Sequence, residues 1–426
     1  MKTNYSLRKS LMLAIVAIGF SYFQMNAQTV VNGIAYNIIN DGAAVEVAPL
    51  PSGERYSEAS MTVPASVEIN GTTYPVKRIG NDSMRENPNL ISVVIPEGVE
   101  SIGDGAFAQC PIITEIVLPS SVKSLEPWAF YGCPKLNKIN IPAGVPMLPH
   151  HIFADTDLRT MELPSSVTEL EYCAFQNARN LSSINLENIR KIGGWSLYGT
   201  AISSATITNV FQIDREAFRL CPNLEKVVLN SVVSIGIWAF TDCTSLSYVV
   251  LGTIETIDEG AFSGCTRLTS LTIPNTVILI QNWSLEKSGL KEIFISWADP
   301  VNEVAIEESA FGADEGKIDF TWKVPEDLSD VYGSQFMGYP VEIGEPPVGI
   351  VTEQINSKNV YYANGSLNLT DMEGYTVSVI SLDGRTIASF RVNGANVQLP
   401  VSLNSGIYLL NANNGNNRSA VKFAVK

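Results

Sequence analysis

The sequence predicts a mainly β repeat solenoid, a stack of short coils that share one continuous core. The pattern in "SIGDGAFAQCPIITEIVLPSSV" (residues 101–122) returns as "SLEPWAFYGCPKLNKINIPAGV" (124–145) and "TIDEGAFSGCTRLTSLTIPNTV" (256–277). Successive copies start 21 to 23 residues apart, and a fixed period of this length is typical of repeat architectures. A unit this short cannot bury a core by itself, so the copies must stack.

Each copy supplies the same buried positions. Aligning the copies on an aliphatic pair three residues apart gives ten repeats from Val76 to Ile280 and a degenerate further copy around Phe311. The residue before the large apolar position is small, mostly Ala, so the backbone can turn there beside its neighbours. Alternating pairs such as Ile116/Leu118 predict a short strand with one face inward. The large apolar position, which we call the spine, reads Met84, Phe107, Phe130, Phe153, Phe175, Leu197, Phe218, Phe240, Phe262, Leu285 and Phe311.

The N-terminus predicts export. Lys2, Arg8 and Lys9 precede an apolar run over residues 11–23, and Ala27 offers a small residue for cleavage. This pattern is typical of a secretory signal peptide, which we expect over residues 1–27. A membrane anchor is the alternative, but the run is short for a span, and no later stretch is long and apolar enough for one.

The charge distribution excludes several partners. The chain carries a net charge of −15, and removal of the three basic residues of the leader lowers it to −18. Residues 348–426 contain four acids and six bases, so residues 28–347 carry −20. Such a surface repels phosphate backbones and anionic lipid, so we expect neither nucleic acid nor a membrane surface as a partner.

The repeat resembles the BspA-type leucine-rich repeats of bacterial surface proteins, in about ten copies over residues 76–311. The preceding stretch "VVNGIAYNIINDGAAVEVAPL" resembles the N-terminal β-hairpin cap of that family. The resemblance implies a right-handed solenoid with a strand-lined face. It implies little about the ligand, because the family is defined by its scaffold. We therefore expect an N-terminal cap over 28–75 and a solenoid over 76–341.

The C-terminal part has a different pattern. After a Pro-rich linker expected at 342–350, short alternating runs are separated by Asp-Gly and Asn-Gly pairs, which predict hairpins of a small β-sandwich over 351–426. The stretches "VISLDGRTI" (379–387), "SGIYLL" (405–410) and "KFAVK" (422–426) resemble the C-terminal sorting domain of type IX secretion cargo in Bacteroidetes. That resemblance implies recognition by the secretion machinery, passage across the outer membrane, and display at or release from the cell surface.

The sequence gives little support for catalysis. It has no nucleophile elbow, P-loop or dinucleotide fingerprint, so we expect no enzyme and no cofactor. Its two histidines, His150 and His151, are adjacent and lack a metal-binding frame, so a solvated loop is favoured over a metal pair. Five of the six cysteines share one column with Thr, Ala and Ser, which predicts buried free thiols. Cys110 and Cys133 are the adjacent pair that could form a disulfide.

Recognition must then use a surface, and the repeat offers two candidates. The residues between inward-facing aliphatics of each strand should face outward, and on the C-terminal half this row is apolar and aromatic, which suggests a contact site. Strand propensity alone explains its Val and Thr residues equally well. The candidate residues on this strand face are Val228, Tyr248, Val250 and Phe294.

The second candidate is a column of tryptophans two positions before the spine: Trp128, Trp195, Trp238 and Trp283. The last three lie two repeats apart, hence at steps of roughly 10 Å at the usual inter-strand spacing. Such steps suit stacking on a polysaccharide, whereas a column that only packs over the ridge between coils is the alternative.

The sequence therefore predicts an exported, cell-surface repeat scaffold that mediates protein binding or adhesion without catalysis. The alternative is a surface protein that binds glycans, which exposed, coplanar tryptophans would favour. We therefore expect a protein or a glycan as the ligand.

Overall fold

The computed structural model describes residues 28–344, except 52, 209 and 314–315, and the strands of a C-terminal region between 360 and 425. The signal peptide predicted over residues 1–27 lies outside the described residues, as do residues 345–350 of the predicted linker. The chain divides into two compact units, Met1–Glu345 and Pro346–Lys426.

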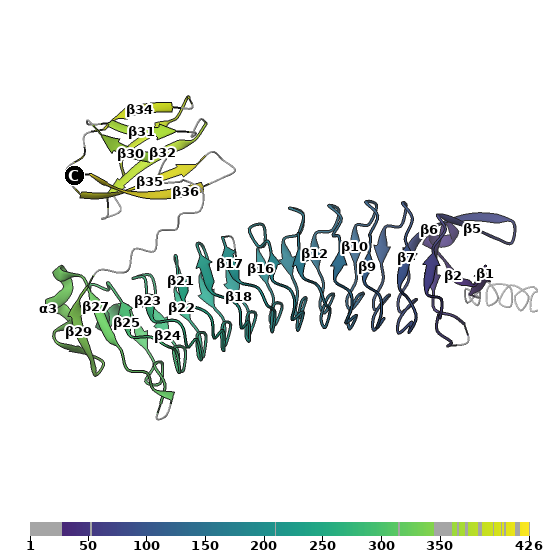
Figure 1. Cartoon of the computed structure of the whole chain (residues 1–426), viewed down its shortest axis with the longest axis horizontal. Helices are drawn as coiled ribbons and strands as arrows, with labels where there is room; N and C mark the ends of the chain where they lie inside the picture. The colour runs from purple at the N-terminus through teal and green to yellow at the C-terminus, as the bar shows by residue number, and fades with distance from the viewer. Residues whose placement is uncertain are drawn as a thin grey trace, which may run out of the picture. The chain divides into compact units, whose positions relative to one another are not determined.

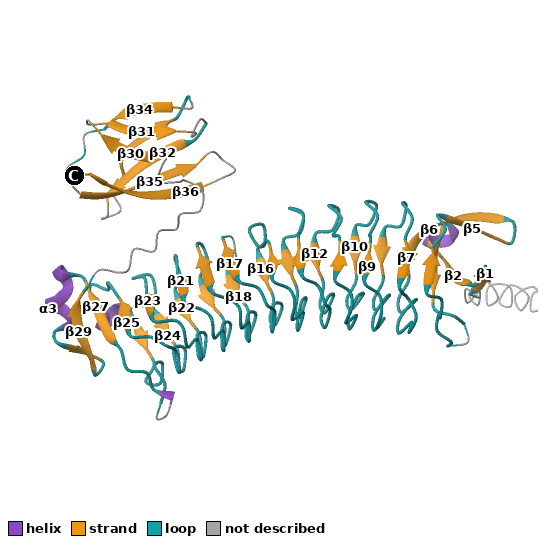
Figure 2. Ribbon diagram, in the orientation of Figure 1, coloured by secondary structure: helices purple, strands orange, loops and turns teal. Residues whose placement is uncertain are grey.

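The first unit is a mainly β solenoid of about 12 coils (Figure 1). Most of each coil is loop and turn, with two short strands, as Figure 2 shows. In the first row, equivalent strands of successive coils pair in parallel, as β9 with β11, β17 with β19 and β23 with β25. This row, which we call the strand face, contains β4 (Ser60–Thr62), β7 (Ser92–Val94), β9 (Glu115–Ile116), β11 (Lys138–Ile139), β13 (Thr160–Met161), β15 (Ser183–Ile184), β17 (Ser204–Ile207), β19 (Lys226–Leu229), β21 (Tyr248–Val250), β23 (Ser270–Thr272), β25 (Glu292–Phe294) and β27 (Thr321–Val324).

The second row of strands pairs in parallel along the stack and is interrupted once, between β10 and β12. At this position Lys123 donates its N–H to Glu100 O (2.8 Å), but the next coil has Pro146, which has no N–H to donate. The proline therefore opens the ladder. The row contains β3 (Ala44–Ala48), β6 (Thr72–Ile79), β8 (Ser101–Ile102), β10 (Ser124–Leu125), β12 (Met147–Leu148), β14 (Glu169–Leu170), β16 (Lys191–Ile192), β18 (Gln212–Ile213), β20 (Ser234–Ile235), β22 (Thr256–Ile257), β24 (Leu279–Ile280) and β26 (Ala305–Ile306).

The predicted spine forms the core. The Phe107 and Phe130 rings stack at 5.7 Å, and Phe240 lies 5.0 Å from Phe218 and 5.4 Å from Phe262, all fully buried. The residue before each spine position, small in all coils but that of Ile152, is also buried. Its carbonyl accepts the spine N–H of the preceding coil, as in Phe107 N–H to Ala129 O (2.8 Å). This close backbone approach explains why Ala dominates that position.

The cysteine column confirms the prediction of buried free thiols. All six cysteines are buried and free. Those of the column donate their thiol to a spine carbonyl of the preceding coil, such as Cys133 Sγ to Phe107 O (3.1 Å) and Cys243 Sγ to Phe218 O (3.1 Å). In the same column Thr156 and Thr200 donate to the spine carbonyl of their own coil (2.8 and 2.9 Å). The position therefore requires a small side chain and not a disulfide.

The N-terminal cap is continuous with the solenoid. A hairpin of β1 (Thr29–Val31) and β2 (Ile34–Ile39) leads through the 3-10 turn η1 (Asn40–Gly42) to β3, which already pairs in parallel with β6. A second hairpin joins β5 (Ser66–Ile69) to β6, and β4 pairs with β7. The expected boundary between residues 75 and 76 falls inside β6, so the coil register begins earlier than the sequence repeat.

An aromatic cluster closes the C-terminal end of the solenoid. After α2 (Pro300–Glu303) and β27, the 3-10 helix η3 (Glu326–Leu328) and α3 (Ser329–Tyr332) lead to β28 (Gln335–Phe336) and β29 (Tyr339–Ile343). Trp322 is fully buried, contacts Phe320 (4.9 Å) and donates its indole N–H to Phe336 O (3.0 Å). Bulky aromatic side chains here cover the last coil, where no further repeat follows.

The second unit consists of two antiparallel sheets. One contains β30 (Val360–Ala363), β31 (Ser366–Thr370) and β34 (Asn396–Pro400); the other contains β32 (Thr376–Ser381), β33 (Thr386–Arg391), β35 (Gly406–Asn413) and β36 (Arg418–Val425). Residues of both sheets, including Leu367, Val377 and Leu410, form one buried cluster. Two antiparallel sheets around one buried cluster are what a β-sandwich requires, and the sandwich itself stays a prediction.

Candidate functional site: the turn edge

In each repeat coil, two residues around the spine position adopt the left-handed backbone conformation. The turns that they form make up one side of the solenoid, which we call the turn edge. Trp128 (φ 54°) donates its N–H to His150 O (3.1 Å), and Trp238 (φ 56°) donates to Glu259 O (2.8 Å). These bonds to the next coil fix the position of each turn. The first left-handed column, two residues before the spine, contains Asp82, Gly105, Trp128, His151, Cys173, Trp195, Glu216, Trp238, Gly260 and Trp283.

The tryptophans of this column occupy strained backbone. Crowding of Cβ makes the left-handed conformation unfavourable by about 1–2 kcal/mol for a residue other than glycine. Gly105 and Gly260 hold the same position in other coils, with φ of 58° and 63°, without that penalty. Folding alone therefore does not require a bulky residue here, and strained residues tend to gather at functional sites.

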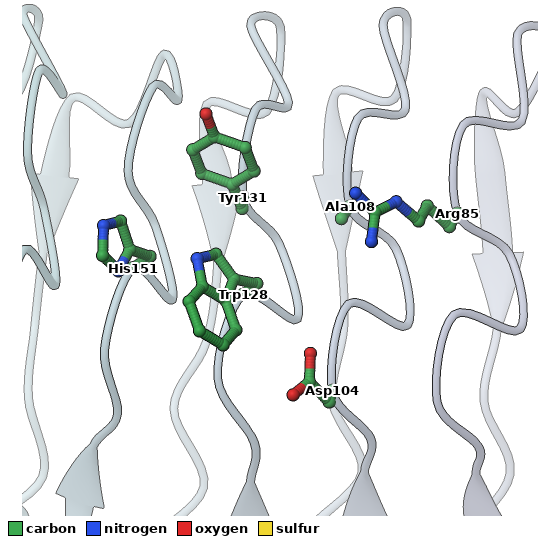
Figure 3. A pocket seen from close by; sticks show the side chains of 6 residues that line it. All are labelled: Arg85, Asp104, Ala108, Trp128, Tyr131 and His151. Carbon is green, nitrogen blue, oxygen red and sulfur yellow. The ribbon is translucent and has the colours of Figure 1, made fainter.

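Aromatic rings form a continuous ladder along the turn edge. Trp128 lies 5.4 Å from His151, which lies 5.7 Å from Tyr172, and Tyr172 lies 6.3 Å from Trp195. Tyr198 extends the series at 5.4 Å from Trp195. The Trp128 and His151 planes differ by 21°. Tyr131 meets His151 edge-on, with an interplanar angle of 82°, and Figure 3 shows the three side chains next to one another. We call Trp128, Tyr131, His151, Tyr172, Trp195 and Tyr198 the aromatic ladder.

Trp238, two coils after Trp195, packs against two arginines. The guanidinium of Arg215 lies 4.3 Å from the Trp238 ring centre and that of Arg219 lies 5.8 Å away. The buried carboxylate of Glu216 accepts hydrogen bonds from Arg215 Nε (3.0 Å) and Arg219 Nη1 (2.9 Å), so both guanidinium groups are held in place. On the other side, a Cβ at Gly260 would collide with the indole of Trp238. The absence of a side chain at Gly260 lets the ring extend over the next coil.

The first of two pockets on the turn edge, the N-side pocket, measures about 400 Å³. Burial, followed by the nearby carboxylates of Asp82 and Glu126, raises the pKa of Asp104. Burial, followed by His150, lowers the pKa of His151, whose Nδ1 is buried without a protein hydrogen-bond partner in the described part of the chain. Its lining residues are Arg85, Asp104, Ala108, Trp128, Tyr131 and His151 (Figure 3).

The C-side pocket measures about 430 Å³ and, like the N-side pocket, is lined by residues of four successive coils. Arg219 stands one residue after its spine Phe218, as Arg85 stands one residue after Met84. The Nε of Arg219 is buried and has no protein partner among the described residues. The lining residues are Arg219, Trp238, Thr241, Gly260, Ser263, Trp283 and Glu286.

All four tryptophans predicted from the sequence therefore lie on this edge. Trp128 and Trp283 are exposed, by 38% and 41%, whereas Trp195 and Trp238 are half-buried beneath their neighbours. Three of them line a pocket, and Trp195 lies in the ladder between the two pockets.

The prediction for the strand face is wrong at two of its four residues. Val228 and Phe294 are buried, with 2% and 6% exposure. In-register pairing places Val228 between Thr206 and Val250, and Phe294 between Thr272 and Lys323, so neighbouring side chains cover them from both sides. Tyr248 and Val250 are half-buried.

Several residues of the turn edge escaped sequence reasoning. Tyr172 and Tyr198 stand at other positions of the repeat than the tryptophans, so no single column contains them. His150 and His151 were predicted to form a solvated loop, but His151 is part of the ladder and is packed between Trp128 and Tyr172. The sequence does show that Arg recurs directly after the spine, at Arg85 and Arg219, and this recurrence could have pointed to the two pockets.

Comparison with known proteins supports the repeat and the C-terminal region. Residues 77–201, 147–253 and 234–339 match the BspA type leucine rich repeat region, in 6 copies, and residues 362–426 match the secretion system C-terminal sorting domain. No curated protein is significantly similar in sequence to this chain.

Three solved structures align with most of this chain at 18–19% identity and TM-scores below 0.5. A leucine-rich repeat protein from Bacteroides ovatus is 18% identical, with a TM-score of 0.48, and the match covers 74% of this chain and 100% of that chain. The pneumococcal vaccine antigen PcpA is 18% identical, with a TM-score of 0.45 and coverage of 75% and 99%. A leucine-rich cell surface protein from Faecalibacterium prausnitzii is 19% identical, with a TM-score of 0.36 and coverage of 72% and 97%. Among the residues that the structure describes, no helix has the length and apolar character needed to cross a membrane.

Proposed function

Because the chain belongs to the BspA-type leucine-rich repeat proteins and ends in a secretion sorting domain, we propose that it is a surface adhesin whose turn edge binds an extracellular macromolecule. The protein is exported and acts at the cell surface. The solenoid supplies the binding scaffold, and no catalytic step is part of the proposal.

The observation that supports this function best is the aromatic turn edge with its two pockets. Trp, Tyr and Arg are the residues that most often dominate binding energy at interfaces. Here they gather on one side of the solenoid, in the aromatic ladder and around Trp238. The strand face offers only the half-buried Tyr248 and Val250 of its four candidate residues. The turn edge is therefore the better candidate for the contact surface.

The turn edge is also rigid enough to bind without much reordering. Three backbone hydrogen bonds join neighbouring coils around each spine residue, such as those from Trp128, Phe130 and Gly132 to the following coil (3.1, 3.2 and 2.9 Å). Side chains held by such a frame lose less conformational freedom on binding. A preorganised edge is what an adhesin needs if it binds through few anchors.

The sorting domain supplies the placement. Its resemblance to secretion cargo implies that the secretion machinery recognises residues 362–426. The second unit has its own buried cluster around Leu367, Val377 and Leu410, so it does not need the solenoid for its core. The two tasks, transport and adhesion, then belong to different units of the chain.

An adhesion assay tests this function. Beads coated with the full exported chain should adhere to at least one surface in a panel of extracellular matrix proteins and polysaccharides, and Trp128→Ala with Trp283→Ala should abolish that adhesion. Phe211→Ala is the matched control, because Phe211 is an exposed aromatic (70%) outside the turn edge. Adhesion that survives the double substitution would refute the turn edge as the contact surface.

A further inference from the structure

We infer that the ligand of the turn edge is a neutral polysaccharide chain, with one sugar-binding subsite in each pocket. This inference rests on the proposed function and names the chemical class of its ligand. Pockets of about 400 and 430 Å³ fall in the range of about 300–1,000 Å³ that is usual for small-molecule sites.

The walls of both pockets suit a sugar ring. One face of a pyranose carries mainly C–H groups, and the flat apolar face of an aromatic side chain can pack against it. The N-side pocket offers Trp128 and Tyr131 (Figure 3). The C-side pocket offers Trp238 and Trp283.

The polar groups of both pockets match hydroxyl groups. Each pocket combines one guanidinium group, Arg85 or Arg219, with one carboxylate, Asp104 or Glu286. A guanidinium only donates hydrogen bonds and a carboxylate only accepts them, whereas a hydroxyl does both. A Pro-rich peptide could also pack on the aromatic rings, but its backbone lacks donors for the carboxylates.

The charges favour a neutral ligand. The lining of each pocket includes one guanidinium and one carboxylate, so it adds no net charge to attract an ion. Each guanidinium is already paired outside the lining, Arg85 with Asp82 and Arg219 with Glu216 (2.9 Å each). The surrounding residues 28–347 carry −20 and would repel an acidic polysaccharide.

The spacing favours a chain over a single sugar. Trp128 and Trp238 are five coils apart, which at the inter-strand spacing of about 4.8 Å is roughly 24 Å. The two coils between the pockets carry Tyr172, Trp195 and Tyr198, so the aromatic surface continues from one pocket toward the other. A chain that occupies both pockets gains affinity because its second contact is intramolecular.

Titration calorimetry on the full exported chain tests this inference. The probes are neutral β-linked trisaccharides and hexasaccharides of glucose, mannose, galactose and N-acetylglucosamine, with oligogalacturonates as the acidic counterpart. At least one neutral trisaccharide should bind with a Kd of about 1 mM or lower, at two sites per chain. Trp128→Ala or Trp283→Ala should leave one site, the double variant none, and Phe211→Ala both. The matching hexasaccharide should bind at least tenfold more tightly.

Three results would overturn the inference: no neutral sugar binds, the double variant still binds the trisaccharide, or the acidic sugars bind more tightly than the neutral ones. The proposed function can survive such a result. If coated beads adhere to a matrix protein in a manner that requires Trp128 and Trp283 while no sugar binds, the turn edge is a protein-binding surface and only the ligand class is wrong.

Discussion

Replacing Phe240 by alanine, beside Cys243→Ser in the same coil, separates a core position from a position that needs only a small side chain. Phe240 is fully buried between Phe218 and Phe262, with ring centres 5.0 and 5.4 Å away. Truncating a buried Phe typically lowers the free energy of unfolding by about 3–5 kcal/mol. With a stacked ring on either side, we expect a loss of about 4 kcal/mol, since each aromatic pair adds about 0.5–1.5 kcal/mol beyond burial.

Cys243→Ser should be much milder. Cys243 donates its thiol to Phe218 O (3.1 Å), and a serine hydroxyl can donate to the same carbonyl. Thr156 and Thr200 already place hydroxyl groups in this column. A loss of about 1 kcal/mol is therefore expected, the size of one imperfect hydrogen bond.

Urea unfolding followed by circular dichroism measures both losses, provided that the slope of the free energy with urea is unchanged. Adding a reductant should not lower the midpoint of the unmodified chain, because its cysteines are free. Equal losses for the two variants, or a lower midpoint after reduction, would refute the reasoning and indicate a disulfide in the column.

Three further predictions follow from the turn edge and the second unit. A chain that ends at Glu345 should unfold like the solenoid of the full chain but remain in the periplasm of its native host; its arrival at the cell surface would show that the second unit is not the sorting signal. The pKa of His151 is lowered by burial and by His150. The folded state therefore binds fewer protons than the unfolded chain, and stability should decrease as pH falls through about 6.5. NMR titration should give His151 a pKa below that value, and a pKa above it would contradict the burial. Gly260→Ala should destabilise the chain more than Gly132→Ala, although both residues have positive φ (63° and 66°). The new Cβ meets the Trp238 indole at Gly260 but only the flexible Gln109 side chain at Gly132. Equal losses in thermal melts would mean that backbone strain alone decides.

The core could be predicted from the sequence because stacking imposes the same requirement on every coil. A spine residue such as Phe240 must fill the same space as Phe218 and Phe262, so size repeats with the period. The cysteine column was predictable for the same reason, since Thr and Ser appear at its other positions.

The ends of the solenoid were less predictable because the period is lost there. At the N-terminus β3 and β4 already follow the coil register without the consensus residues. At the C-terminus Trp322, Phe320 and Tyr339 cover the last coil. Their role depends on closing the stack, which no repeat position encodes.

The candidate site was predicted in part. The column of tryptophans placed four residues on the turn edge, but Tyr172, Tyr198 and Arg219 come from other repeat positions and meet the tryptophans only through the left-handed turns. Strand alternation correctly separated inward from outward positions on the N-terminal half, where Val94 and Val117 are exposed. It did not anticipate that cross-strand neighbours bury Val228 and Phe294.

The most direct test of the turn edge as the binding surface is ¹⁹F NMR of the full exported chain labelled with 5-fluorotryptophan. The chain has six tryptophans, of which Trp297 and Trp322 are fully buried at the C-terminal end of the solenoid and serve as internal controls. At saturation with the ligand retained in the adhesion assay, we predict that the signals of Trp128, Trp195, Trp238 and Trp283 shift while those of Trp297 and Trp322 do not. Unchanged signals from the four turn-edge tryptophans, together with loss of binding in Tyr248→Ala, would contradict the account and assign recognition to the strand face.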